Sequence, residues 1–194
     1  MAMVDLVGLH KYFILEHLKE GDVAVDFTMG NGNDTLFLSK TVGDGGRVYA
    51  FDIQEEALIS TRAFLEANGA PENYTLICAS HHRVKEFVDG PIKAGMFNLG
   101  YLPRSGKKAV TTMRETTMPA VEAALELLAP DGVLIVAIYP GHEEGALEGE
   151  MLREYFKGLS RFRICPSEFK ILNSPSSPYF FLVEKSPKAK FGEI

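Results

Sequence analysis

The sequence has few cysteines, no long apolar run and no excess of basic residues. Its two cysteines, Cys78 and Cys165, lie far apart and in no CxxC or Cys/His spacing typical of a metal site. No apolar run reaches the roughly 18 residues that a membrane-spanning helix needs. His10, Glu16 and Lys19 interrupt the first twenty residues, which is unlike a signal peptide. These absences predict a cytoplasmic protein with no metal and no membrane contact.

The charge balance also bears on whether the protein binds nucleic acid. The formal net charge of −6 argues against a chain coated in basic surface for nucleic acid. A local basic groove remains compatible with it, because phosphates respond to local clusters of charge. With 194 residues, 46% of them hydrophobic, the chain is expected to form one globular domain.

Apolar, β-rich runs alternate with helical patterns along the chain, which is typical of a parallel sheet covered by helices. The predicted strands are 23–27, 47–51, 74–79, 94–98, 133–139, 162–172 and 179–184. The predicted helices are 6–19, 34–41, 55–67, 112–128 (opened by a capping box) and 144–157. The last two strands suit a hairpin. We therefore expect a single α/β domain over residues 1–185, including an N-terminal helix, and a frayed tail over 186–194.

The stretch VDFTMGNGNDT, residues 25–35, predicts a ligand-binding turn between the first strand and a helix. Gly30 and Gly32 permit a tight turn and close approach of a ligand, and Asn33 or Asp34 can cap the helix. A dinucleotide fingerprint would need a third glycine, where Thr35 stands. Asp34 would also oppose a diphosphate, so a phosphate-free ligand is favoured.

Two aspartates indicate which chemical groups the ligand carries. Asp52 ends the second strand, twenty residues after Gly32, where a carboxylate can hold ribose hydroxyls. Asp26, before the glycines, suits a ligand with a cationic amine. S-adenosylmethionine has both features, and residues 26–32 match D-x-G-x-G-x-G with Thr28 for the first glycine. The alternative is a glycine turn in another kind of α/β enzyme.

Polar residues at two later strand ends are candidates for the acceptor site. In MFNLGYLP, residues 96–103, Asn98 and Tyr101 stand where amino-group methyltransferases carry N/D-P-P-Y, although Leu99 and Gly100 replace the prolines. Asn98 could instead merely end a strand. In YPGHEEG, residues 139–145, His142 could contact substrate or cap the next helix.

Together, DFTMGNGNDTLFL, FNLGYLP and YPGHEEG resemble the bacterial rRNA methylase family, whose characterised members resemble tRNA wobble-uridine methyltransferases acting on 5-aminomethyl-2-thiouridine. The resemblance implies a class I S-adenosylmethionine-dependent methyltransferase (Rossmann-like) fold, with a seven-stranded, mostly parallel sheet and a C-terminal antiparallel strand. It also implies a tRNA anticodon arm as partner and a homodimer. At Arg104 the chain departs from the small residue or glycine usual in the family.

The resemblance assigns residues by position. Those at the donor would be Asp26, Thr28, Gly30, Asn31, Gly32, Asn33, Asp34, Asp52, Ile53, Ser80, His81 and Asn98. Those at the acceptor would be Asn98, Tyr101 and His142. Basic residues near this edge, which could bind RNA or simply be solvated, are Arg104, Lys107, Lys108 and Arg114.

Several other functions remain open from the sequence. The enzyme could methylate a small-molecule amine or rRNA. It could also be a nucleotide-binding protein without catalysis, or a nicotinamide dehydrogenase, which the missing third glycine disfavours. The group that accepts the proton of the amine could be a carboxylate, His142, His81 or solvent.

Overall fold

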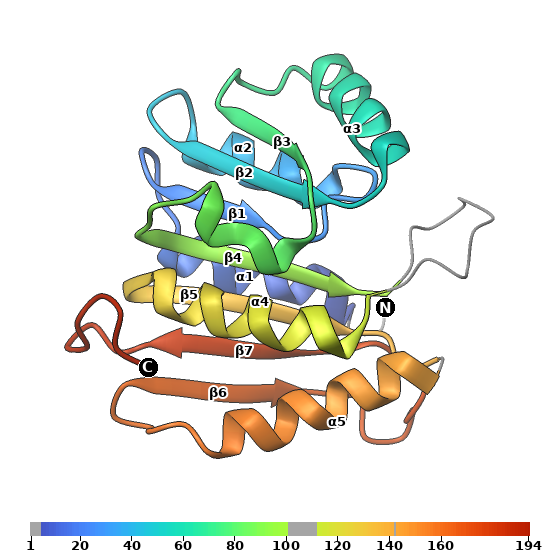
Figure 1. Cartoon of the computed structure of the whole chain (residues 1–194), viewed down its shortest axis with the longest axis vertical. Coiled ribbons are helices and arrows are strands. Elements are labelled where there is room, and N and C mark those ends of the chain that lie inside the picture. The colour runs from blue at the N-terminus through green and yellow to red at the C-terminus, as the bar shows by residue number, and fades with distance from the viewer. Residues whose placement is uncertain (1–4, 101–111, 142) are drawn as a thin grey trace.

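The computed structural model describes residues 5–100, 112–141 and 143–194. Within these residues one seven-stranded sheet lies between two layers of helices (Figure 1), in the order β3-β2-β1-β4-β5-β7-β6. β7 runs antiparallel to both of its neighbours, and the other pairs are parallel. The strands are β1 Val23–Asp26, β2 Arg47–Asp52, β3 Tyr74–Cys78, β4 Ile92–Leu99, β5 Leu128–Ile138, β6 Ile164–Phe169 and β7 Tyr179–Lys185. The predicted fold class is confirmed.

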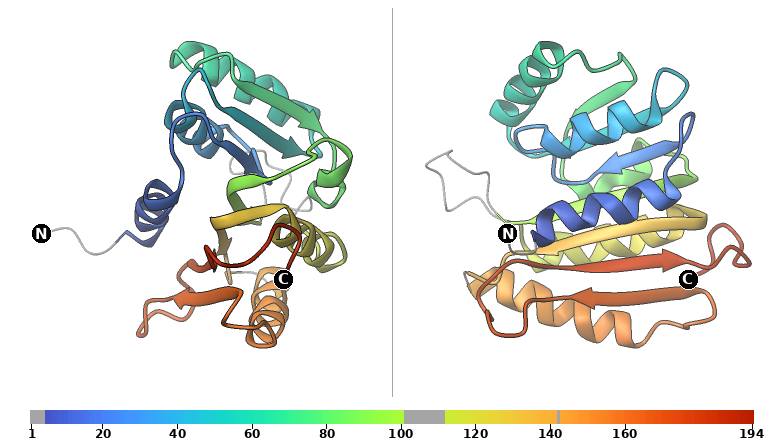
Figure 2. Two further views of the ribbon diagram at one scale, coloured as in Figure 1. Left: turned by 90° about the vertical axis from the view of Figure 1, so that its left-hand side faces the viewer. Right: turned by 180° about the vertical axis from the view of Figure 1, so that it is seen from behind.

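Helices cover both faces of the sheet, as parallel strands require. They are α1 Leu6–His17, α2 Asn33–Val42, α3 Glu55–Ala67, α4 Arg114–Leu127 and α5 Glu143–Lys157, with a 3₁₀ helix η1 at His81–Glu86. α1 and α2 lie on one face, and η1, α4 and α5 lie on the other (Figures 1 and 2). In the part of the chain that the structure describes, no helix is both long and apolar enough to cross a bilayer.

The strand order reverses between β1 and β4, the point at which open α/β sheets bind ligands. Phe27 follows β1 and Phe97 belongs to β4, and their rings stack with centroids 4.0 Å apart. Both side chains are buried. This packing fixes the ends of the two central strands relative to each other.

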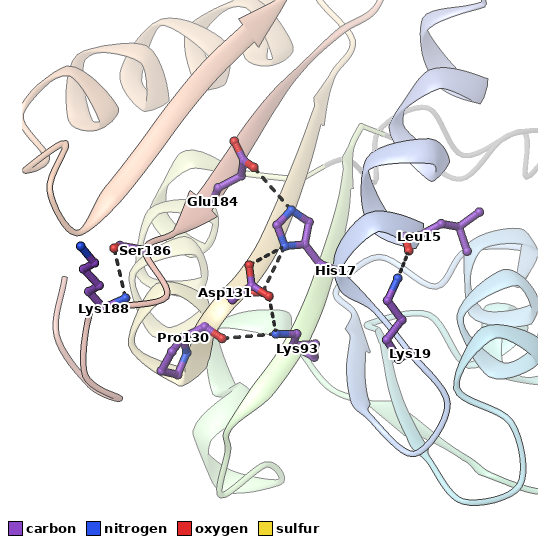
Figure 3. Close-up of polar contacts among 9 residues, drawn as sticks. All are labelled: Leu15, His17, Lys19, Lys93, Pro130, Asp131, Glu184, Ser186 and Lys188. Atoms are coloured by element: carbon purple, nitrogen blue, oxygen red, sulfur yellow. Dashed lines mark hydrogen bonds and ion pairs between the residues drawn. The ribbon is translucent and has the colours of Figure 1, made fainter.

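α1 crosses one face of the sheet from the carboxyl edge of the parallel strands to the amino edge (Figure 2). At the amino edge, His17 Nδ1 lies 3.4 Å from Asp131 Oδ1 and His17 Nε2 lies 3.4 Å from Glu184 Oε1. Lys93 joins the same group through Asp131 (Figure 3). Because its last turn is held by β5 and β7, the first turns of α1 lie over the opposite edge of the sheet.

Two predicted helix caps were wrong. Gly32, at φ 82°, is the N-cap of α2, and no side chain caps that helix. Met113 takes the N-cap position of α4, where a capping box with Thr112 was predicted. The hydroxyl of Thr112 instead donates to Glu148 Oε2 over 2.8 Å. A buried carboxylate on a distant helix therefore competes successfully for the capping hydroxyl.

Residues 186–194 lie in turns that contact the domain. The Ser186 amide donates to the Arg163 carbonyl over 2.7 Å. Ala189 is buried, and Ile194 packs against the apolar core.

Candidate active site

The loop after β1 forms a cradle that requires glycine. Gly30 has φ 53° and Gly32 has φ 82°, in the left-handed region that side chains disfavour. A Cβ atom on Gly32 would lie 2.8 Å from Thr61 Cγ2. Thr61, on α3, also donates to the Gly30 carbonyl over 3.0 Å. The loop is therefore shaped by its own backbone and by a neighbouring helix.

Asp26 is fully buried beneath this loop. Its Oδ1 accepts the Thr28 amide over 3.1 Å, and its Oδ2 accepts the Thr35 hydroxyl over 2.6 Å. Burial, and then the charge of Asp34, raise its pKa to about 7. Asp26 thus connects the end of β1 to the loop and to α2. These hydrogen bonds help to hold the loop in its conformation.

Asp52 ends β2 beside the cradle. Its Oδ2 accepts the Gly30 amide over 3.1 Å and its Oδ1 accepts the Gln54 amide over 3.0 Å. Partial burial raises its pKa, although these bonds oppose the shift. The Ile53 backbone and the Gln54 side chain also hydrogen-bond to this carboxylate. The following residue, Ile53, leaves 57% of its surface exposed.

Asn98, near the end of β4, is the centre of a polar group on the other side of the cradle. Its backbone N–H donates to Thr28 Oγ1 over 2.7 Å, and its side-chain Nδ2 donates to Asp34 Oδ2 over 2.7 Å. The Tyr139 hydroxyl donates to Asn98 Oδ1 over 3.3 Å. Asp34 Oδ1 lies 3.1 Å from Lys11 Nζ. An oriented amide oxygen and a carboxylate therefore lie side by side at this edge.

His81 begins η1 and lies under the loop from the other face. Its Nδ1 is 3.2 Å from the Phe27 carbonyl, and its ring meets Phe97 edge-on. Burial lowers its pKa to about 4, so the ring is neutral at neutral pH. The buried Nε2 has no hydrogen-bond partner among the described residues. The preceding Ser80 hydroxyl lies 2.8 Å from His82 Nδ1.

The structure brings most of the predicted residues together around the ends of β1, β2 and β4. Asn31 is half-buried in the loop, and Asn33 is exposed at the first position of α2. Arg114, predicted to bind RNA, pairs through Nε with Glu144 Oε1 at 3.0 Å. Five predicted site residues lie outside the described residues: Tyr101, Arg104, Lys107, Lys108 and His142.

Sequence reasoning missed the contribution of α1. His10 and Lys11 lie at the carboxyl edge, and Lys11 pairs with Asp34. A signal was present, because His10, Ile14 and Leu18 recur every four residues and share one helix face. That spacing predicts a buried histidine. The sequence of α1 alone does not indicate which strands it covers.

Comparison with known proteins identifies the family. Residues 48–185 match the model of the family described as "Putative rRNA methylase". The chain belongs to this family. The resemblance inferred from the three motifs is therefore confirmed.

Members and relatives of the rRNA methylase family with known structures share the whole fold. A structure from Clostridium thermocellum with the same description is 38% identical, has a TM-score of 0.91, and covers 95% of this chain and 100% of its own. A Streptococcus mutans protein in complex with SAH is 34% identical, with a TM-score of 0.85 over 95% of this chain and 99% of its own. By family and fold, the chain is placed among S-adenosylmethionine-dependent methyltransferases.

One relative carries a specific activity in its name. The chloroplastic tRNA (mnm(5)s(2)U34)-methyltransferase of Arabidopsis thaliana is 37% identical over 178 residues, which are 87% of this chain. The chain spans 65% of the length of that relative.

The residues present fit S-adenosylmethionine. The cradle at Gly32 would be filled by a Cβ, and the Asp52 carboxylate, a group that accepts hydrogen bonds from hydroxyls, lies beside it. His81 Nε2 is a buried polar atom without a partner in the described part of the chain, and a polar atom of a purine could satisfy it. No group of three potential metal-ligating side chains occurs among the described residues.

Proposed function

We propose that the protein transfers a methyl group from S-adenosylmethionine to the aminomethyl nitrogen of 5-aminomethyl-2-thiouridine at the wobble position of tRNA. The observation that carries this proposal is the polar group around Asn98. There an amide oxygen and the Asp34 carboxylate lie together at the edge of the sheet where the donor cradle ends. The name of the Arabidopsis relative supports the choice of nucleoside.

The donor-side residues bind and orient. The donor supplies an electrophilic methyl group on a sulfonium centre. Asp52 would accept hydrogen bonds from its ribose hydroxyls, and Ile53 would cover part of its adenine. The backbone around Gly30 and Gly32 would hold the methionine portion. Since the sulfonium is a good leaving group, correct alignment supplies much of the rate enhancement, with roughly 7–11 kcal/mol available from positioning.

The acceptor-side residues select an amine. Asn98 Nδ2 is engaged by Asp34, so the orientation of the amide is set and Oδ1 faces donors. Oδ1 already accepts the Tyr139 hydroxyl and has a second lone pair for an N–H of the substrate. The negative charge of Asp34 favours a cationic or polarised amine at the same place. An acceptor carbon or carboxylate would gain nothing from this arrangement.

We expect RNA recognition to involve the basic residues that the sequence predicts near this edge. Arg104, Lys107 and Lys108 were predicted to contact the anticodon arm and lie outside the described residues. Arg114 begins α4, and its side chain is 42% exposed while paired with Glu144. A phosphate could share this guanidinium, which has five N–H donors. The homodimer stays a prediction.

A small-molecule amine methyltransferase is the second candidate. The net charge of −6 favours it, because most of the surface repels a polyanion. An rRNA substrate, which the family description names, is the third.

Methyl transfer from labelled donor separates these candidates. The protein would be incubated with S-adenosylmethionine labelled in the methyl group and with tRNA from cells that lack the wobble methylation. Digestion and mass spectrometry would then identify the labelled nucleoside. We expect label in 5-methylaminomethyl-2-thiouridine. Label in another nucleoside, or in rRNA only, would contradict the proposed substrate. Donor binding without any transfer to RNA would favour the small-molecule candidate.

A further inference from the structure

His10 is a buried histidine with unused hydrogen-bonding capacity. It lies in the second turn of α1, with 1% of its surface exposed. Neither Nδ1 nor Nε2 has a hydrogen-bond partner among the residues that the structure describes. Its ring meets the Phe180 ring edge-on, with centroids 6.2 Å apart. One nitrogen of a neutral imidazole is an acceptor, and no described residue donates to that lone pair.

If packing were the only role of residue 10, an apolar side chain would be more stable there than histidine. His10 shares its helix face with Ile14 and Leu18, which are both buried. A buried polar group without a partner is destabilising, because it loses its hydrogen bonds to water. An imidazole on this otherwise apolar face therefore points to a use for its nitrogen atoms.

His10 lies beside the acceptor group of the proposed active site. Its neighbour Lys11 pairs with Asp34, and the negative charge of Asp34 acts on His10 as well. The other oxygen of the same carboxylate accepts from Asn98. Phe180, against which the ring packs, is near the start of β7 and pairs in register with Ala137 of β5. These contacts place His10 at the carboxyl edge of the sheet, where Asn98 also lies.

We propose that His10 accepts the proton that the primary ammonium of the substrate must lose before its nitrogen can be methylated. This inference rests on the proposed function. In the first step an N–H bond of the ammonium breaks, its electron pair stays on nitrogen, and the proton moves to the free lone pair of the imidazole. In the second, the nitrogen lone pair forms the N–C bond while the C–S bond breaks and its electrons stay on sulfur. His10 then returns the proton to solvent.

The surroundings of His10 suit a base that works near neutral pH. Burial lowers its pKa from 6.5, so the ring is uncharged before substrate binds. The charges facing it are Asp34 from α2 and Asp5 and Lys11 from its own segment; the two carboxylates favour the imidazolium and the lysine opposes it. Of the strand residues at this edge, Tyr139 carries a phenol whose pKa is raised by burial. Asp34 would thus stabilise the imidazolium formed during turnover.

The test is the pH dependence of single-turnover methylation by the wild-type enzyme and by His10→Gln. In the wild type we expect a rate that is constant across neutral pH and falls at acidic pH as His10 becomes protonated. In His10→Gln the rate at pH 7 should fall by about 10²-fold, within the range for loss of a general base. It should then rise tenfold per pH unit, because only the free amine in solution can react. Donor affinity should stay unchanged.

Ile14→Ala, on the same helix face, is the control for loosened packing. It should change the rate by one factor at every pH. If His10→Gln shows that same pH-independent loss, or no loss, the proposed role is wrong. A wild-type rate that stays flat at every acidic pH at which the enzyme remains folded would overturn it too, even if the His10 variant does not fold. Absence of tRNA methylation by the wild type would instead overturn the proposed function.

Discussion

Asn98 at the end of β4 donates from Nδ2 to Asp34 Oδ2 in α2 over 2.7 Å, across 64 positions of sequence. The bond joins the strand that ends at the acceptor edge to the helix that follows the glycine loop. It leaves the amide oxygen facing hydrogen-bond donors. One interaction therefore links β4 to α2 and sets the orientation of the Asn98 amide.

Asn98→Ala should reduce turnover much more than donor binding. The substrate amine would lose its acceptor while the cradle around Gly30 and Gly32 stays intact. We expect the methylation rate to fall about 10²-fold, an effect typical for loss of one oriented polar group in an active site. The dissociation constant for S-adenosylmethionine, measured by calorimetry, should change by less than about threefold. Asn173→Ala, at an exposed turn, is the matched control. Equal losses in rate and affinity would place Asn98 at the donor instead.

Asp52→Ala should weaken donor binding. Its carboxylate accepts the Gly30 amide and is proposed to accept the ribose hydroxyls, and hydrogen bonds to charged groups contribute about 1.5–3 kcal/mol each. We expect the dissociation constant to rise by at least about tenfold. Asp89→Ala, which removes an exposed carboxylate, should leave it unchanged. A donor affinity that survives the loss of Asp52 would contradict the ribose assignment.

Asp26 should make stability fall as pH rises through the weakly acidic range. Its pKa is about 7 in the folded protein, against 3.8 ordinarily. Between these values the native state binds more protons than the unfolded state, so unfolding becomes easier with increasing pH. At about 1.4 kcal/mol per pKa unit, the difference amounts to at most about 4 kcal/mol.

Denaturant unfolding at pH 4.5 and pH 8 measures this dependence. Asp26→Asn keeps a side-chain oxygen that can accept from the Thr28 amide and removes the ionisation. Its free energy of unfolding should therefore decline less between the two pH values than that of the wild type. Buried His81, whose pKa is lowered, acts in the opposite direction but is common to both proteins. Parallel pH curves for the two proteins would show that Asp26 does not titrate in this window.

Reversing two charges should separate RNA binding from donor binding. The double variant Lys107→Glu with Lys108→Glu should raise the Michaelis constant for tRNA, and more so at low salt, because phosphate contacts are screened by salt. Donor affinity should not change. Lys188→Glu with Lys190→Glu, at exposed positions of the C-terminal segment, alters the net charge equally and serves as the control. If both pairs give the same effect, net charge rather than a local groove governs tRNA binding.

The parts of the site that were predicted from sequence are those set by local pattern. Asp26, Asp52 and Asn98 lie at or near strand ends, and strands of a parallel sheet end at one edge. The start of β5 was predicted at residue 133 but is Leu128. Pro130, Asp131 and Gly132 favour a turn, yet Leu128 pairs with Ile92 across an irregularity in β4. Tertiary pairing therefore overrode the local preference.

The missed parts depend on contacts between distant segments. His10 and Lys11 belong to α1, which packs on β4, β5 and β7. The sequence of residues 6–17 does not indicate that these strands are its partners. Likewise, the hydroxyl of Thr112 could not be assigned to Glu148 without knowing that α4 and α5 are neighbours. Spacing along one element predicts which face is buried but not what lies opposite.

The contact between His10 and Phe180 has a consequence for biosynthesis. α1 is synthesised long before β7, against which it packs. Contacts of such long sequence separation form late, because the intervening chain must first be ordered. The glycine loop and its neighbouring strands can assemble while translation continues, but the edge that holds His10 cannot. A nascent chain would thus acquire its donor cradle before its acceptor side, which would be complete only after β7 has been synthesised.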